Sequence, residues 1–139
     1  MANIGAALFE ILDADATLGT LLGDSGSTSG MTKIYPGIAP QNETAPFITY
    51  QRISTPPDLC KEGLKVLNHR YQVNVWDDNP DDTSTLADRV RVVLQDAAGT
   101  YATAKIQCIN FDGDQDDVET SLDPPLFGRM LDFIIRETL

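Results

Sequence analysis

The chain has 139 residues, of which 42% are hydrophobic and 22% are charged. This length fits one domain, and the composition excludes general disorder. Ten Lys and Arg against 21 Asp and Glu give a net charge of −11, which excludes nonspecific attraction to nucleic acid phosphates or anionic lipids. No apolar run approaches the roughly 20 residues of a spanning helix, and the first residues lack the basic start of a secretory signal. We therefore expect a protein made in the cytoplasm, without a membrane partner.

The beginning of the sequence has the pattern of a helix. Apolar residues recur at helical spacing from Ile4 to Leu22, which predicts one amphipathic N-terminal helix. The small, polar residues from Gly23 to Gly30 are poorly suited to packing, and they predict a flexible loop over 23–30. Ordered structure is expected to resume near Ile34.

Two strands are predicted next. β-forming residues run from Pro46 to Ser54, and apolar residues alternate with polar ones from Leu67 to Val75, which is typical of strands with one buried face. Pro56 and Pro57 end the first strand, because proline cannot donate to a ladder. The segment 55–65 is therefore predicted to be a projecting loop between two antiparallel strands.

A second helix is predicted from Pro80 to Ala98. Asn79 offers a capping side chain, and proline suits the first helical position that follows it. The predicted buried stripe consists of Leu86, Val90, Val93, Leu94 and Ala97. Alternation then predicts a third strand from Thr103 to Phe111, and an apolar face predicts a fourth from Leu126 to Glu137.

These elements follow the order α-β-β-α-β-β. Strands joined in pairs by short connections favour antiparallel pairing. We therefore predict an α+β fold in a single domain over residues 1–139. It would have a mainly antiparallel four-stranded sheet with two helices packed on one face.

The acidic run from Asp112 to Glu119 is a candidate metal site. Its aspartates at the first, third and fifth positions resemble the oxygen ligands of a calcium loop. The sixth position, however, is Asp117 instead of glycine, and the twelfth is Asp123 instead of a bidentate glutamate. We interpret the run as a solvated loop between strands. A small acidic metal- or ligand-binding domain that uses this loop is the alternative function.

The sequence holds no convincing catalytic constellation. Cys60 and His69 are a conceivable nucleophile and base, but His69 falls on the apolar face of its strand and Cys60 has no basic neighbour beyond Lys61. Phosphate-loop, nucleophile-elbow and zinc-protease motifs are absent from the sequence. We predict two reduced thiols, no catalytic residue, no metal and no cofactor.

Four arginines fall within the predicted strands of this acidic chain: Arg52, Arg70, Arg129 and Arg136. Solvation at the surface is one interpretation. Pairing with acidic loops of a neighbouring subunit is the other. Composition alone leaves both interpretations open.

Several short motifs carry a resemblance to a known family. After the N-terminal helix come Ile34-Tyr35-Pro36, Ala39-Pro40-Gln41, the segment Ala45–Arg52, the segment Arg70–Trp76 and Leu86-Ala87. In this order and spacing, over nearly the whole chain, the sequence resembles the tail terminator proteins of long-tailed bacteriophages, which are also called tail completion or tail-to-head joining proteins.

The resemblance implies a structural virion protein without an active site. Such a protein forms a ring, usually a hexamer, at the head-proximal end of the tail tube, at the junction of tail and neck. The implied partners are further copies of the chain, the tail tube protein and a head completion or connector protein. DNA would pass through the pore without specific binding, which suits an acidic ring. Assembly would take place in the host cytoplasm.

The loop over 55–65 gives the predicted contact site of such a ring. Leu59 and Leu64 are poorly placed in solvent unless they dock on another surface. We therefore predict that the loop contacts a neighbouring subunit or the tube end, through Pro57, Asp58, Leu59, Cys60, Lys61 and Glu62. The alternative is that both leucines fold back on their own domain.

Overall fold

The computed structural model describes residues 3–22, 33–39, 45–60, 63–95, 97–121 and 125–139, with the backbone alone for 57–60 and 63–65. The helices are α1 (Ile4–Asp13), α2 (Ala16–Leu21) and α3 (Pro80–Leu94). The strands are β1 (Ile34–Pro36), β2 (Phe47–Ser54), β3 (Pro57–Cys60), β4 (Gly63–Asp77), β5 (Gly99–Tyr101), β6 (Ala104–Glu119) and β7 (Leu126–Thr138). The loop predicted over 23–30 lies outside the described residues.

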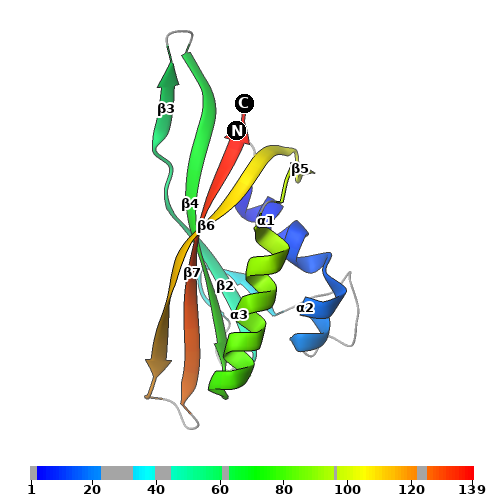
Figure 1. Ribbon diagram of the computed structural model, residues 1–139, viewed down its shortest axis with the longest axis vertical. Helices are drawn as coiled ribbons and strands as arrows, with labels where there is room; N and C mark the ends of the chain where they lie inside the picture. Colours follow the sequence, from blue (N-terminus) through cyan, green and yellow to red (C-terminus); the bar gives the residue numbers. More distant parts are fainter. Residues whose placement is uncertain (1–2, 23–32, 40–44, 61–62, 96, 122–124) are drawn as a thin grey trace.

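The sheet is mixed and curled, so the predicted four-stranded antiparallel sheet with two helices is wrong. Six strands follow one another in the order β1-β2-β4-β7-β6-β5, and β3 pairs with β4 outside this path. β1 runs parallel to β2, whereas the other pairings are antiparallel. The three helices lie on one side of the sheet (Figure 1). β1 and β5 were missed because strands of three residues are too short to show a periodicity.

The predicted N-terminal helix is two helices. Asp15 lies at the break with extended backbone angles, and its side-chain carboxylate accepts the backbone N–H of Leu18 at 2.9 Å. This cap starts α2 and satisfies a donor that a helix N-terminus otherwise leaves unpaired. The apolar residues keep their helical spacing on both sides of Asp15, so the spacing did not indicate that the helix breaks there.

Helix α3 confirms the predicted start and most of the predicted stripe. The Asn79 side chain accepts backbone N–H groups of Asp81 and Asp82, and proline occupies the first turn. Leu86, Val90 and Leu94 are buried, while Val93 and Ala97 pack partly buried against the core. The helix ends at Leu94 rather than at the predicted Ala98, because Gln95 adopts extended backbone angles.

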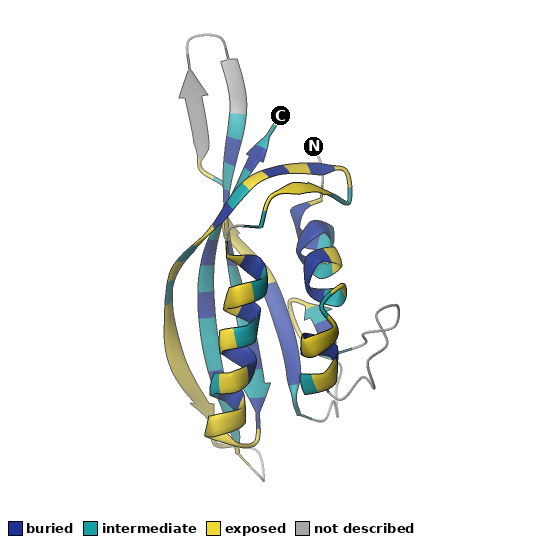
Figure 2. Cartoon of the chain, turned by 45° about the vertical axis from the view of Figure 1, so that its right-hand side comes forward, coloured by how far each residue is buried: buried dark blue, intermediate teal, exposed yellow. Residues whose placement is uncertain are grey.

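The core lies between the helices and one face of the sheet. The stripe of α3 faces buried apolar residues of the two central strands, among them Val73, Val75, Leu131, Phe133 and Ile135. Figure 2 shows buried residues along the sides of the helices that turn to the sheet. Strand β7, predicted from Leu126 to Glu137, is confirmed to within one residue. Burying this face supplies most of the hydrophobic stabilisation of the fold.

The acidic run is part of a strand, so its interpretation as a loop is wrong. β6 continues through Glu119 and pairs with β7 as far as Leu126. A bulge interrupts the register between Phe111 and Gly113, and Gly113 has a φ of +136°. Charged residues mask a strand in the sequence when the strand lies exposed at an edge, as β6 does in Figure 2.

Candidate assembly surface

The sheet reaches opposite ends of the molecule, and a two-stranded arm extends it at one of them. At one end β3 pairs with the first residues of β4, and at the other end β6 runs beside β7 (Figure 1). The segment 55–65, predicted as a loop, thus contains strand β3 and the start of β4. The predicted contact residues Pro57, Asp58, Leu59 and Cys60 form β3 itself, where Pro57 lies opposite Leu67 and Cys60 opposite Gly63. Lys61 and Glu62 lie outside the described residues.

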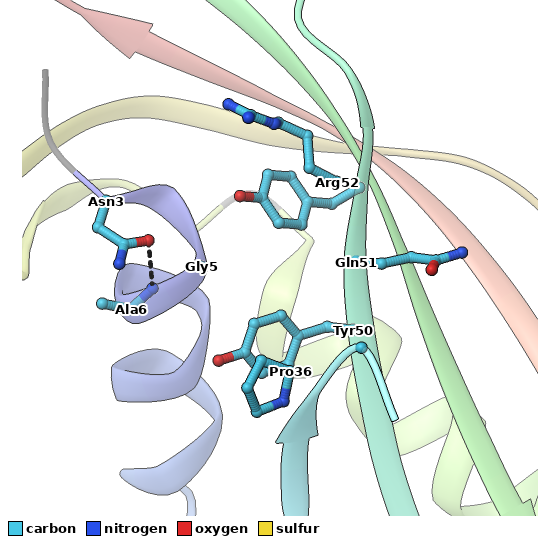
Figure 3. Close-up of a pocket in the computed structure, with 9 residues that line it drawn as sticks. Asn3, Gly5, Ala6, Pro36, Tyr50, Gln51 and Arg52 are labelled. Atoms are coloured by element: carbon cyan, nitrogen blue, oxygen red, sulfur yellow. Dashed lines mark hydrogen bonds between the residues drawn. The ribbon is translucent and has the colours of Figure 1, made fainter. Parts of the chain in front are cut away.

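A surface pocket of about 530 Å³ lies where the start of α1 approaches the β1/β2 edge of the sheet. Its lining includes Gly5 of α1, Pro36 of β1, and Tyr50, Arg52 and Tyr71 of β2 and β4. Figure 3 shows Tyr50 reaching from β2 toward α1, with Arg52 on the same side of the strand and Gln51 on the opposite side. Alternation along β2 therefore directs a phenol and a guanidinium to one place.

The pocket offers hydrogen-bond donors and a positive charge. Tyr50 and Tyr71 are 8% and 7% exposed, and burial raises the pKa of both phenols, so both stay protonated at neutral pH. The Gly5 N–H donates to the Tyr71 oxygen, whereas no described residue bonds the Tyr50 hydroxyl. Among the described residues Arg52 likewise has no carboxylate partner. The arrangement suits a carboxylate or another small anion.

Close approach between α1 and β2 shapes this pocket. A Cβ at Gly5 would lie 3.3 Å from a ring carbon of Tyr50 and 3.8 Å from the Tyr71 oxygen. The glycine therefore lets the helix start lie against the two phenols. The Asn3 side chain caps α1 by accepting the Ala6 N–H at 3.2 Å.

Three arginines of the strands form side-chain hydrogen bonds within the chain. Arg70 donates to Asp112 at 2.9 Å. Arg129 donates to Asp116 at 2.8 Å and to the Ser84 hydroxyl of α3 at 3.1 Å. Arg136 donates to Gln107 at 2.7 Å. Two carboxylates of the acidic strand, those of Asp112 and Asp116, are thus bonded within the chain. The contacts connect β6 with β4 and β7, and Arg129 also connects β7 with α3.

The acidic strand is arranged poorly for a cation. Because side chains alternate across a strand, the acidic residues are divided between the two faces of the sheet, with Asp114 and Asp116 on one face and Asp117 and Glu119 on the other. In the described part of the chain, no group of three or more His, Cys, Asp or Glu residues is placed to hold a metal ion. The geometry therefore gives no support to the alternative of a metal-binding loop.

His69 has the structural role that its place on the apolar face predicted. It is 1% exposed, with Nε2 at 2.9 Å from Glu137 Oε1 and Nδ1 at 3.1 Å from Thr55 Oγ1. Sequence reasoning missed Glu137 as its partner, although Glu137 continues the buried alternation of β7. Cys108 is a free, half-buried thiol. The backbone alone is described for Cys60, so the nucleophile and base considered above are not brought together by any described contact.

The sheet face without helices carries a row of polar side chains. Gln51 donates to Gln72 at 3.4 Å, and Gln72 donates to Asp132 at 3.4 Å. Asn74 donates to Thr49 beside them, also at 3.4 Å. The row thus joins three amides and a threonine hydroxyl to the carboxylate of Asp132. No described helix is long and apolar enough to cross a membrane.

Comparison with known proteins identifies the class. The family model "Tail completion protein gp17" matches residues 6–138. A chain of a solved structure, "Virion of native gene transfer agent (GTA) particle", has the same fold with a TM-score of 0.76 at 18% identity, over 98% of this chain and 95% of that chain. No curated protein sequence matches the chain.

Fold, surface and family model together define a structural protein of a phage tail. The chain belongs to the tail completion protein gp17 family, since the family model spans nearly its whole length. This confirms the family resemblance found in the motifs of the sequence. The family is one of structural tail proteins and not a class of enzymes.

Proposed function

We propose that this protein is a tail terminator. It forms a closed ring, a hexamer, at the head-proximal end of the tail tube, stops polymerisation of the tube and joins the tail to the head connector. The observation that carries this proposal is the family match over residues 6–138. The likeness to a chain of a gene transfer agent virion supports a place in the particle, which would be the junction of tail and neck. Assembly takes place in the host cytoplasm.

The two ends of the sheet support contacts at two levels of the tail. The arm of β3 and β4 lies at one end of the molecule, and β6 and β7 reach the other (Figure 1), so one ring of copies can present one end to the tube and the other to the connector. The arm of β3 and β4, with Pro57 to Glu62, is the proposed contact with a neighbouring subunit or with the tube end. An arm reaches a partner surface without rearranging the core.

The charge of the chain suits a pore for DNA. At a net charge of −11, the ring repels the DNA backbone, whereas a basic lining would bind it strongly through counterion release. The amides on the uncovered sheet face add polar contacts without positive charge. DNA therefore passes without specific binding.

The experiment replaces Pro57 to Glu62 with a Gly-Ser linker and measures mass and ring formation beside the wild type. We expect the shortened protein to keep its helical circular dichroism signal and melting behaviour, because the arm lies outside the core. Rings or tube capping should be lost, whereas the wild type reaches a mass near that of a hexamer. Normal rings and normal tube capping by the shortened protein would contradict the role of this arm.

A further inference from the structure

The curled sheet ends in two different open edges. On one side β1 covers only Ile48 to Tyr50 of β2, so Arg52 to Ser54 have no described strand outside them. On the other side β5 covers β6 only as far as Ile106. Within the described residues, β6 is therefore an edge strand from Gln107 to Glu119. Such edges present unpaired backbone donors and acceptors to other chains.

The two edges match in direction and in level. Since β2, β4, β7 and β6 follow one another in antiparallel pairs, β2 and β6 run in opposite directions. Copies that share one orientation therefore present antiparallel edges to each other. One row of Cα partners crosses the sheet through Pro36, Tyr50, Val73, Leu131 and Asp114. Rotation about an axis along the strands keeps this level, so Asp114 of one copy comes beside Pro36 of the next, which lines the pocket one strand outside Tyr50.

The edges also match in chemistry. Asp114 lies opposite the buried Leu131, so its carboxylate is on the helix side of the sheet, as are the side chains of Tyr50 and Arg52 (Figure 3). Asp114 is exposed; Arg129 of the same chain is near enough to interact with its charge, but no described residue forms a hydrogen bond with it. The pocket edge in turn holds the Tyr50 hydroxyl and the Arg52 guanidinium; among the described residues, the hydroxyl has no hydrogen-bond partner and the guanidinium has no carboxylate partner.

We propose that the ring closes edge to edge: the β6 edge of one copy lies along the β1/β2 edge of the next, and Asp114 enters the pocket to accept hydrogen bonds from Tyr50 and Arg52. The occupant of the pocket is a second copy of this chain. The contact is heterologous, with different surfaces on the two copies, which is the type of contact that a closed ring requires. This inference rests on the proposed ring, and it names the surface that holds the ring together.

The test measures rings by mass and electron microscopy, in purified protein and at the ends of tubes grown with the tail tube protein. Arg52→Glu would place two carboxylates at the contact, and Asp114→Arg would place two guanidinium groups there. Each variant should therefore raise the protein concentration at which half of the chains are in rings by about tenfold or more. Tyr50→Phe should weaken assembly and leave the melting temperature of the monomer unchanged, since the hydroxyl has no partner within the described chain. The combined Arg52→Glu/Asp114→Arg variant should recover rings.

A control changes charge on the exposed face of α3. Val92 is 63% exposed, and Val92→Glu and Val92→Arg should each assemble as the wild type does. If the wild type forms rings and each single variant forms them equally well, the proposed edge contact is wrong, whereas the proposed ring is retained. If the wild type forms rings neither alone nor on tubes, the proposed function fails and this contact fails with it.

Discussion

The Trp76 ring lies against Gly128 in the neighbouring strand. The two residues are Cα partners in the β4–β7 ladder, and a Cβ at position 128 would come within 2.6 Å of two ring carbons of Trp76. Real side chains do not approach so closely, so the glycine is what allows the indole to cover the ladder. A direct cross-strand contact of this kind stabilises the pairing of the two central strands.

Gly128→Ala should therefore destabilise the protein by about 1–3 kcal/mol, because the indole must shift away from its place. The same substitution in a Trp76→Leu background should cost less, since the smaller side chain leaves room for the methyl group. Chemical denaturation of the two single variants and the double variant measures this coupling. Equal costs of Gly128→Ala in both backgrounds would contradict the contact.

The stripe of α3 should be essential for folding. Val90 and Leu94 are both 0% exposed, so Val90→Asp or Leu94→Asp buries an unpaired charge at a cost of several kcal/mol, against a typical total of about 5–15. Little soluble folded protein is expected. Val92 on the same helix is 63% exposed, and Val92→Asp should change stability by about 0.5 kcal/mol or less. Similar thermal unfolding of all three variants would refute the assignment of the buried face.

Asp77 should make the protein less stable as the pH rises. Burial first, and the neighbouring Asp78 next, raise the pKa of its carboxyl from 3.8 to about 6. The folded state thus binds the proton more tightly than the unfolded state, so stability falls between pH 3.8 and about 6. Asp77→Asn keeps an oxygen to accept the Asp78 N–H and removes the charge. It should raise the free energy of unfolding at pH 7 by about 2 kcal/mol relative to the wild type.

Unfolding free energies of wild type and Asp77→Asn, measured from pH 4 to pH 7, check this prediction. The difference between the two proteins should grow with pH across this range. A constant difference would mean that the carboxyl titrates at the same pH in the folded and unfolded states.

The buried pair of His69 and Glu137 should act as a unit. Because both side chains are almost fully buried and hydrogen-bonded to each other, His69→Leu or Glu137→Leu leaves one polar group without its partner. Each single change should cost about 3 kcal/mol or more, whereas the double change should cost clearly less than the sum. Denaturant unfolding of the four proteins gives the coupling, and strictly additive costs would argue against it.

Local signals in the sequence predicted some elements well. Helix α3 was predictable because its cap at Asn79 and its stripe lie within one segment. β7 was predictable because it is a central strand with a buried face. β1 was not, since three residues acquire their role only by pairing with β2. The second half of β6, from Asp112 to Glu119, could not be recognised as a strand in the sequence, because its carboxylates lie at an exposed edge of the sheet.

The candidate surface was predictable only in part. Pro56 and Pro57 indicated a segment that departs from the first strand, although they did not indicate that β3 would pair with β4 there. The pocket of Tyr50 and Arg52 was not predictable, since α1, β1, β2 and β4 build it together from segments far apart in the chain. Alternation along β2 was its one local signal.

Electron microscopy of tail tubes tests the central proposal most directly. Tube protein is polymerised with and without this chain, and tube ends and lengths are compared. We predict a ring on one end of each tube grown in its presence, and growth that stops at that end. Tubes that carry no ring and grow to the same length with and without the protein would contradict the account.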